Sequence, residues 1–114
     1  MITFTSRTFK FKAWDKEARL LMKLSSIDCL KGELFKKNHF LLQFTGHRDK
    51  HEEEIYEMDV VLLSSDKFVV TWDEESNGWW LTEVKTEKKW QRYTKEIAEK
   101  SVRLCSYFES EQEK

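Results

Sequence analysis

Proline is absent from this 114-residue chain, which has only three glycines and two cysteines. So few glycines leave no Gly-rich loop to cradle a phosphate group, and no stretch rich in proline or serine marks a linker between domains. Two cysteines do not make a disulfide framework, so Cys29 and Cys105 are predicted to be reduced thiols, buried as small apolar side chains. Residues 1–114 are therefore predicted to form one domain.

Long apolar runs are missing as well. The longest, such as Val60–Leu63, cover a few residues, whereas a membrane-spanning helix needs about 20. Residues 1–14 lack the uninterrupted apolar core of a signal peptide, so we expect a cytoplasmic protein that makes no membrane contact. The 20 basic and 21 acidic residues nearly cancel. No net charge therefore attracts nucleic acid or anionic lipid, which leaves a local basic patch as the remaining route.

Bulky aromatic residues are what the sequence has in quantity. They make up 14% of the chain and include five Trp and eight Phe. Although the mean hydropathy is −0.71, these side chains supply enough apolar area for a core, which argues against disorder. A chain of this size keeps a high ratio of surface to volume, and a homo-oligomer would ease it.

Alternation of apolar and polar residues predicts the first strands. The first strand is expected over Thr8–Trp14, and its two faces would be Phe9, Phe11 and Ala13 on one side and Lys10, Lys12 and Trp14 on the other. Ala18–Leu24 is predicted to return as a second strand. Ile27–Phe35 has Gly32 at its centre, a pattern compatible with a short strand, a bend and another short strand.

The stretch Leu41–Val61 is predicted to be the organising hairpin. An apolar strand over residues 39–44 precedes Gly46, where a turn needs a residue free to take positive φ. A charged loop over residues 47–54 leads to a second strand over residues 55–62. Its alternation places the carboxylates of Glu57 and Asp59 on one face and directs three apolar side chains to the core: Tyr56, Met58 and Val60.

The second half of the chain predicts another hairpin, a short helix and a last strand. Lys67–Asp73 and Gly78–Val84 are joined through Asn77-Gly78, a strong turn signal. The three- and four-residue spacing of Trp90, Tyr93 and Ile97 suits a helix over residues 90–100, with a shorter helix capped by Thr94 as the alternative. A strand follows over residues 102–108, and residues 109–114 are expected to fray. The fold class is therefore mostly β, with antiparallel strands curled into a small, partly open barrel and one short helix; a small α+β fold is the alternative.

Catalytic and metal-binding patterns are weak in this sequence. His47, Asp49 and His51 are followed by three glutamates, but a loop gives them no ligand geometry, so a solvated charged loop is favoured over a metal site. No serine, cysteine or lysine lies in a nucleophile signature. We therefore expect no enzyme activity, no metal and no cofactor. A hydrolase would need a cleft that joins Asp49, Glu57 and Asp73.

Basic and aromatic residues are interleaved at two places and form the candidate binding residues. Such patterns suit stacking of bases and contact with phosphates, although the outer face of an ordinary strand produces them too. The candidates are Lys10, Lys12, Trp14, Lys89, Trp90 and Arg92. Trp79 and Trp80 are adjacent on a strand and must point to opposite faces, so one of them is a candidate contact for a protein partner.

Several motifs occur in the order of a known family. They are Phe9–Lys16, Leu42–Gly46 with Asp49-Lys50, Glu54–Glu57 with Asp59-Val60, and Val70–Glu74. The chain resembles the YopX family of phage, prophage and mobile-element proteins. That family usually has Asn-Gly where this chain has His51-Glu52, and Gly where it has Met58, so the resemblance does not fix the turn geometry at either place. Its closing Asn and Pro are also missing here.

The resemblance implies a mostly-β fold with barrel character and an accessory role in phage or mobile-element biology, with self-association open. It implies no known activity, so no catalytic residue is carried over. We therefore predict a non-enzymatic protein-interaction or self-assembling module, with an unidentified protein or a second copy as partner. The alternative is a small β-barrel that binds nucleic acid.

Overall fold

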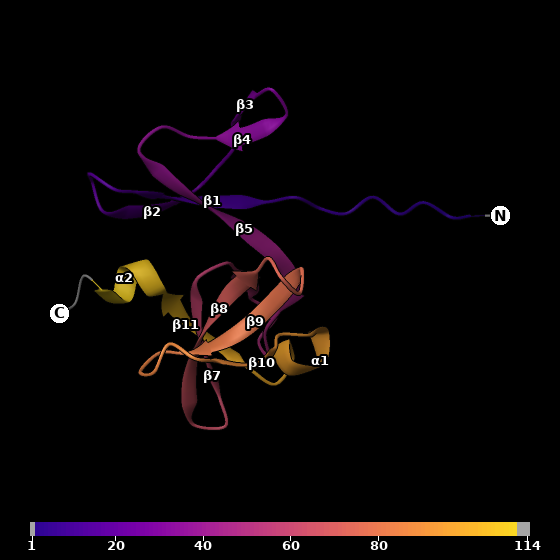
Figure 1. Ribbon diagram of the computed structural model, residues 1–114, viewed down its shortest axis with the longest axis vertical. Helices are drawn as coiled ribbons and strands as arrows, with labels where there is room; N and C mark the ends of the chain where they lie inside the picture. The colour runs from indigo at the N-terminus through magenta and orange to yellow at the C-terminus, as the bar shows by residue number, and fades with distance from the viewer. Residues whose placement is uncertain (1, 112–114) are drawn as a thin grey trace.

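The chain forms two larger antiparallel sheets, and the long strand β5 of the first sheet runs toward the second (Figure 1). The computed structural model describes residues 2–111. The first sheet has the order β2 (Leu20–Lys23), β1 (Phe11–Asp15), β5 (His39–Arg48), β6 (Glu54–Tyr56). The second has the order β10 (Lys89–Arg92), β9 (Gly78–Glu83), β8 (Asp66–Asp73), β7 (Asp59–Leu63), β11 (Val102–Ser106). The remaining elements are the hairpin β3 (Asp28–Leu30) and β4 (Glu33–Phe35) and the helices α1 (Lys95–Ala98) and α2 (Tyr107–Glu111).

The five-stranded sheet curls into a half-barrel and supplies most of the main buried cluster. The buried members of this cluster are Ile55, Val61, Phe68, Val70, Leu81, Tyr93 and Ala98. A second aromatic cluster joins α2 to the first sheet, because Phe108 stacks on Trp14 and Phe40 with ring centroids 5.6 and 5.4 Å apart. Such contacts add to the area that the rings bury. The prediction of a mostly-β antiparallel fold with a partly open barrel is confirmed.

The local expectations succeed where alternation is clean. Asp66–Asp73 and Gly78–Glu83 pair in register, with Asn77 at φ 53° in the turn. The predicted short strands around Gly32 are β3 and β4, and Gly32 takes φ +83° between them.

The first strand begins later than expected, at Phe11, and Phe9 is 59% exposed. Cys29 is exposed and not buried as predicted.

The organising hairpin differs from the prediction in both strands. Gly46 takes φ +87° inside β5, where the register with β6 shifts between Phe44 and Arg48, so the glycine forms a bulge and not the turn. The second strand is interrupted because Met58 takes φ 68° between β6 and β7. As a result Met58 does not continue the core face, and Asp59 is 1% exposed.

The helix over residues 90–100 was also predicted wrongly. Residues 89–92 form β10 and pair with β9, so Trp90 and Tyr93 do not lie on a helix. The shorter alternative is confirmed: Thr94 caps α1, and its side chain accepts a hydrogen bond from the Ile97 backbone N–H. The last strand ends at Ser106, and α2 follows. Of the tail expected to fray, residues 109–111 are helical and residues 112–114 lie outside the described part of the chain.

Candidate functional site

Lys12 on β1 shares a face with Trp14, which is directed toward α2, whereas Lys10 precedes β1 and contacts Phe44 of β5 and Glu54 of β6. Trp14, a candidate binding residue from the sequence, is 5% exposed and stacks on Phe108, so its ring is part of the packing and not of a binding surface. The Lys12 ammonium lies 4.4 Å from the centroid of the Tyr56 ring, and the Lys10 Nζ lies 2.5 Å from the Glu54 Oε2. Lysine stems cover apolar surface while their charged ends reach polar partners, and this is why a lysine-rich face lies against protein here.

Trp79 and Trp80 point to opposite faces of β9, as predicted, but both are half-buried. Trp79 packs against the core and meets Trp72 at 4.9 Å in an edge-to-face arrangement. The Trp80 Nε1–H donates a hydrogen bond of 2.7 Å to the Ser76 Oγ. The expectation of one exposed ring in this pair is therefore corrected, and the neighbouring Trp72 is the more exposed ring, at 40%.

Lys89 and Arg92 hold the turn between β8 and β9. Lys89 forms an ion pair with Asp73, and Arg92 donates to the Ser76 backbone oxygen at 3.1 Å. The Lys89 hydrogen bond, with a second from Ser76, lowers the pKa of Asp73 to about 2. Because these side chains already have partners within the protein, their local role is to fasten β10 to the turn.

This network predicts a pH dependence. The folded-state pKa of Asp73 lies below its ordinary value of 3.8, so its ionised form stabilises the fold above pH about 4, and that contribution is lost as pH falls toward 2. With asparagine in place of Asp73, the free energy of unfolding should decrease less between about pH 4 and about pH 2 than it does in the wild type. Urea unfolding at several pH values measures this. Glu74→Gln, in the same turn, is the control. An unchanged slope in the Asp73 variant would contradict the assignment.

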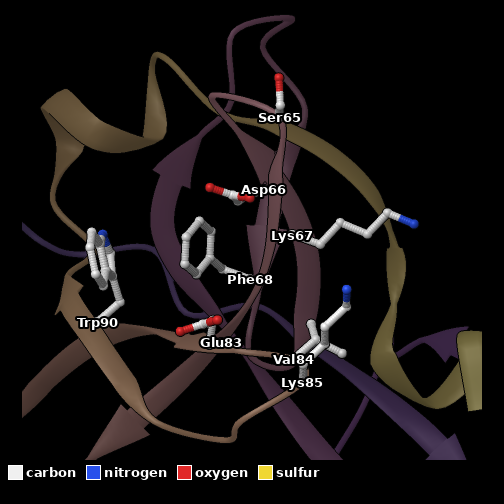
Figure 2. Close-up of a pocket in the computed structure, with 8 residues that line it drawn as sticks. All are labelled: Ser65, Asp66, Lys67, Phe68, Glu83, Val84, Lys85 and Trp90. Carbon is white, nitrogen blue, oxygen red and sulfur yellow. The ribbon is translucent and has the colours of Figure 1, made fainter.

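Trp90 stands beside an open hollow of about 390 Å³ at the edge of the five-stranded sheet. It is 61% exposed, and its ring stacks over Phe68 with centroids 6.3 Å apart. Figure 2 shows the carboxylates of Asp66 and Glu83 on the same side as Phe68 and Trp90, while the ammonium groups of two lysines point to the other side. The hollow therefore joins an aromatic surface to negative charge, which suits a cationic or aromatic side chain.

The charged loop after β5 contains a buried carboxylate that sequence reasoning treated as solvated. Asp49 is 3% exposed. Its oxygens accept backbone hydrogen bonds from His51, Glu53 and Arg103 at 2.8–2.9 Å. Asp49 thus ties the loop to β11. Within residues 2–111, no group of three or more His, Cys, Asp or Glu side chains is placed to hold a metal ion.

A second buried carboxylate, Asp59, pairs with Arg103. The Arg103 Nε lies 2.9 Å from the Asp59 Oδ2, which also accepts the Tyr56 backbone N–H at 2.8 Å. Burial raises the pKa of Asp59, and the hydrogen bonds from Arg103 oppose it. Next to this pair is a hollow of about 320 Å³. Its lining residues are Lys12, Lys23, Arg48, Glu53, Glu54, Tyr56 and Arg103.

The apolar side chains with the highest exposed fractions among the described residues lie at the amino-terminal end. Residues 2–9, which we call the arm, are exposed and form no strand, and Figure 1 shows them leading away from β1. Ile2 is 94% and Phe4 87% exposed. The hairpin β3–β4 adds the exposed side chains of Leu30, Leu34 and Phe35. Only Thr8 and Phe9 of the arm fell within a predicted element, the strand expected over Thr8–Trp14, and the structure leaves both outside β1.

Comparison with known proteins agrees with this fold. A family model described as YopX protein matches residues 20–102. The chain belongs to the YopX family. A search of curated proteins gives no match. The crystal structure of protein EF1440 from Enterococcus faecalis is similar, with a TM-score of 0.61 and 16% sequence identity. That similarity covers 94% of this chain and 98% of EF1440, and it concerns the fold.

The YopX motif residues that the structure describes have structural partners. The Thr45 hydroxyl donates to the Ile55 backbone oxygen at 2.7 Å, Gly46 forms the bulge of β5, and the Asp49 and Asp59 carboxylates are buried acceptors. In this YopX protein the motif therefore encodes the junction of the two sheets. No helix within residues 2–111 has the length and apolar content to cross a bilayer.

Proposed function

We propose that this YopX protein is a non-enzymatic interaction module that self-associates, with the arm of one copy adding a strand to the five-stranded sheet of a second copy. The observation that carries the proposal is the arm itself: an extended segment with exposed Ile2, Phe4 and Phe9 and no strand partner within the described residues. Extended segments of this kind gain main-chain hydrogen bonds when they add to the open edge of a sheet.

The arm leaves its own backbone groups without protein partners. Between residues 2 and 9 no backbone hydrogen bond joins the arm to the rest of the described chain, and the first such bond is from the Phe44 N–H to the Lys10 carbonyl. Isolated exposed apolar residues are ordinary, but Ile2, Phe4 and Phe9 occur within eight residues. Contiguous exposed apolar groups mark interaction sites.

The edge strand β10 is the acceptor that fits the arm best. It ends the five-stranded sheet, so its outer backbone groups face no strand. The hollow beside it carries Trp90 with the carboxylates of Asp66 and Glu83. The arm carries Arg7 among its apolar residues. An eight-residue strand spans roughly 26 Å, which is enough to run along the whole of β10.

Sedimentation velocity over a range of concentrations tests this function. Phe4→Ser and Trp90→Ser should each weaken self-association roughly ten- to a hundredfold, because burying one aromatic side chain is worth about 1.5–3 kcal/mol. Leu104→Ser is the matched control, since Leu104 is exposed and apolar but lies on β11. A wild-type protein that sediments as a monomer at every concentration would overturn the proposal.

A further inference from the structure

Two lysines face each other across the first sheet. Lys12 on β1 and Lys23 on β2 are register partners, so their side chains project from the same face. Like charges directly opposite each other destabilise a strand pair. Both side chains line the hollow of about 320 Å³ described above, where Arg48 from β5 and Arg103 from β11 join them. Four strands thus bring four cations around one space.

The carboxylates of Glu54 and Asp59, near this hollow, form ion pairs with other cations and do not pair with Lys12 or Lys23. Glu54 accepts from Lys10 at 2.5 Å and from Arg48 at 3.5 Å. Asp59, behind Arg103, is occupied by that guanidinium and a backbone N–H. Within residues 2–111 neither Lys12 nor Lys23 has an ion-pair partner. The lining holds four cations and the two carboxylates of Glu53 and Glu54. Arg48 is paired with Glu54 and Arg103 with Asp59, so Lys12 and Lys23 are the two lining cations left without an ion pair among the described residues.

Burial and the neighbouring positive charges both act on the Lys12 ammonium. Its side chain is half-buried over the Tyr56 ring. Burial lowers the pKa of Lys12, and the positive charges of Arg103 and Lys23 lower it further, against the opposing effects of the Asp59 and Glu109 carboxylates. The fold thus holds these cations close together at an electrostatic cost that an anion in the hollow would remove.

We propose that this hollow is a binding site for a phosphate group, with Lys12, Lys23, Arg48 and Arg103 as the cationic lining. Multivalent oxyanions gain the most from several converging ammonium and guanidinium groups. A neighbouring hollow shares Lys23, Glu54 and Tyr56 with this site and is lined further by Phe9, Phe11 and Ser25. The group that carries the phosphate would lie in this neighbouring hollow. Two sources of phosphate therefore fit the site: free phosphate and a phosphate in the backbone of a nucleic-acid strand.

Titration of the full-length protein with inorganic phosphate, against chloride at equal ionic strength, tests the site. Lys23→Gln should weaken phosphate binding roughly ten- to a hundredfold. Because the substitution removes a repulsion, it should also raise the melting temperature in phosphate-free buffer. Lys12→Met, which keeps the apolar stem over Tyr56, should likewise weaken phosphate binding and raise the melting temperature in phosphate-free buffer. Lys37→Gln, an exposed lysine away from the hollow, is the matched control.

A parallel titration with a single-stranded oligonucleotide distinguishes the two sources. Tighter binding of the oligonucleotide than of inorganic phosphate, lost in Lys23→Gln, supports a strand backbone as the source. A response to inorganic phosphate alone, lost in the same variant, supports a free phosphate. Equal stabilisation of wild type, Lys23→Gln and Lys37→Gln by phosphate is a general salt effect and would overturn the proposal. So would the absence of any response to either ligand.

Discussion

Replacing Asp59 with alanine is expected to lower the free energy of unfolding by about 3–5 kcal/mol, the usual cost of leaving one member of a buried ion pair alone. The Asp59 side chain is 1% and the Arg103 side chain 18% exposed. The substitution leaves the guanidinium without its carboxylate and the Tyr56 N–H without its acceptor. Urea unfolding followed by tryptophan fluorescence measures the change.

The double variant Asp59→Ala with Arg103→Met shows how much of this loss belongs to the pair. Methionine keeps much of the arginine stem and carries no charge that needs a partner, so the double variant should lose less stability than the sum of the two single variants. Val84→Ala, an exposed apolar position on the connector after β9, should change stability by no more than about 0.5 kcal/mol. Strict additivity of the single variants would contradict a coupled pair.

Replacing Asp49 with alanine is expected to cost about 3 kcal/mol, since hydrogen bonds to a charged group contribute about 1.5–3 kcal/mol each and are partly replaced by water. Burial acts to raise the pKa of Asp49, but the backbone N–H groups of Arg103, Glu53 and His51 outweigh it and hold the pKa below its usual value. The stabilisation is therefore present above pH about 4 and is lost as pH falls below it.

Two measurements separate the role of Asp49 from a general effect of the loop. Urea unfolding of His51→Ala should show little change, because His51 is exposed and contributes its backbone N–H, which the variant keeps. Hydrogen exchange at the Arg103 amide should accelerate in Asp49→Ala, since that amide donates to Asp49 at 2.8 Å. Wild-type stability and unchanged exchange in the Asp49 variant would refute its role in joining the loop to β11.

The sequence predicted strands well where apolar and polar residues alternate and one face meets the core. It failed at Met58, whose positive φ interrupts the second strand of the predicted organising hairpin. Glu52 and Met58 have φ of 66° and 68°, so their side chains gave no sign of the turns that they occupy. Both lie at positions where the YopX family usually has glycine. The missing glycines showed where the turns differ from the family pattern, but they did not predict the backbone conformation.

The helix prediction failed for a different reason. Trp90 and Tyr93 are three residues apart, a spacing that matches a helix. Residues 89–92 nevertheless form an edge strand, in which they are stabilised by pairing with β9. Tyr93 still reaches the core, where its hydroxyl lies 2.9 Å from the Ser101 Oγ. Apolar spacing over so few residues does not separate a helix from a strand followed by a turn.

The candidate sites were harder to predict than the fold. Each binding residue named from the sequence belongs to a local run, whereas the basic hollow collects one side chain from each of β1, β2, β5 and β11. Only strand order and register bring Lys12 beside Lys23 and both beside Arg103. Of the arm, the predicted strand Thr8–Trp14 included only Thr8 and Phe9, and residues 2–7 carried no structural prediction.

Hydrogen exchange at the backbone amides of residues 3–9 tests the central claim most directly, because strand addition protects these amides and an isolated arm does not. We predict protection at high protein concentration that disappears on dilution and in Trp90→Ser, with the amides of β8 protected throughout. Exchange of the arm amides at the rate of an unstructured peptide, at every concentration, would contradict self-association through the arm.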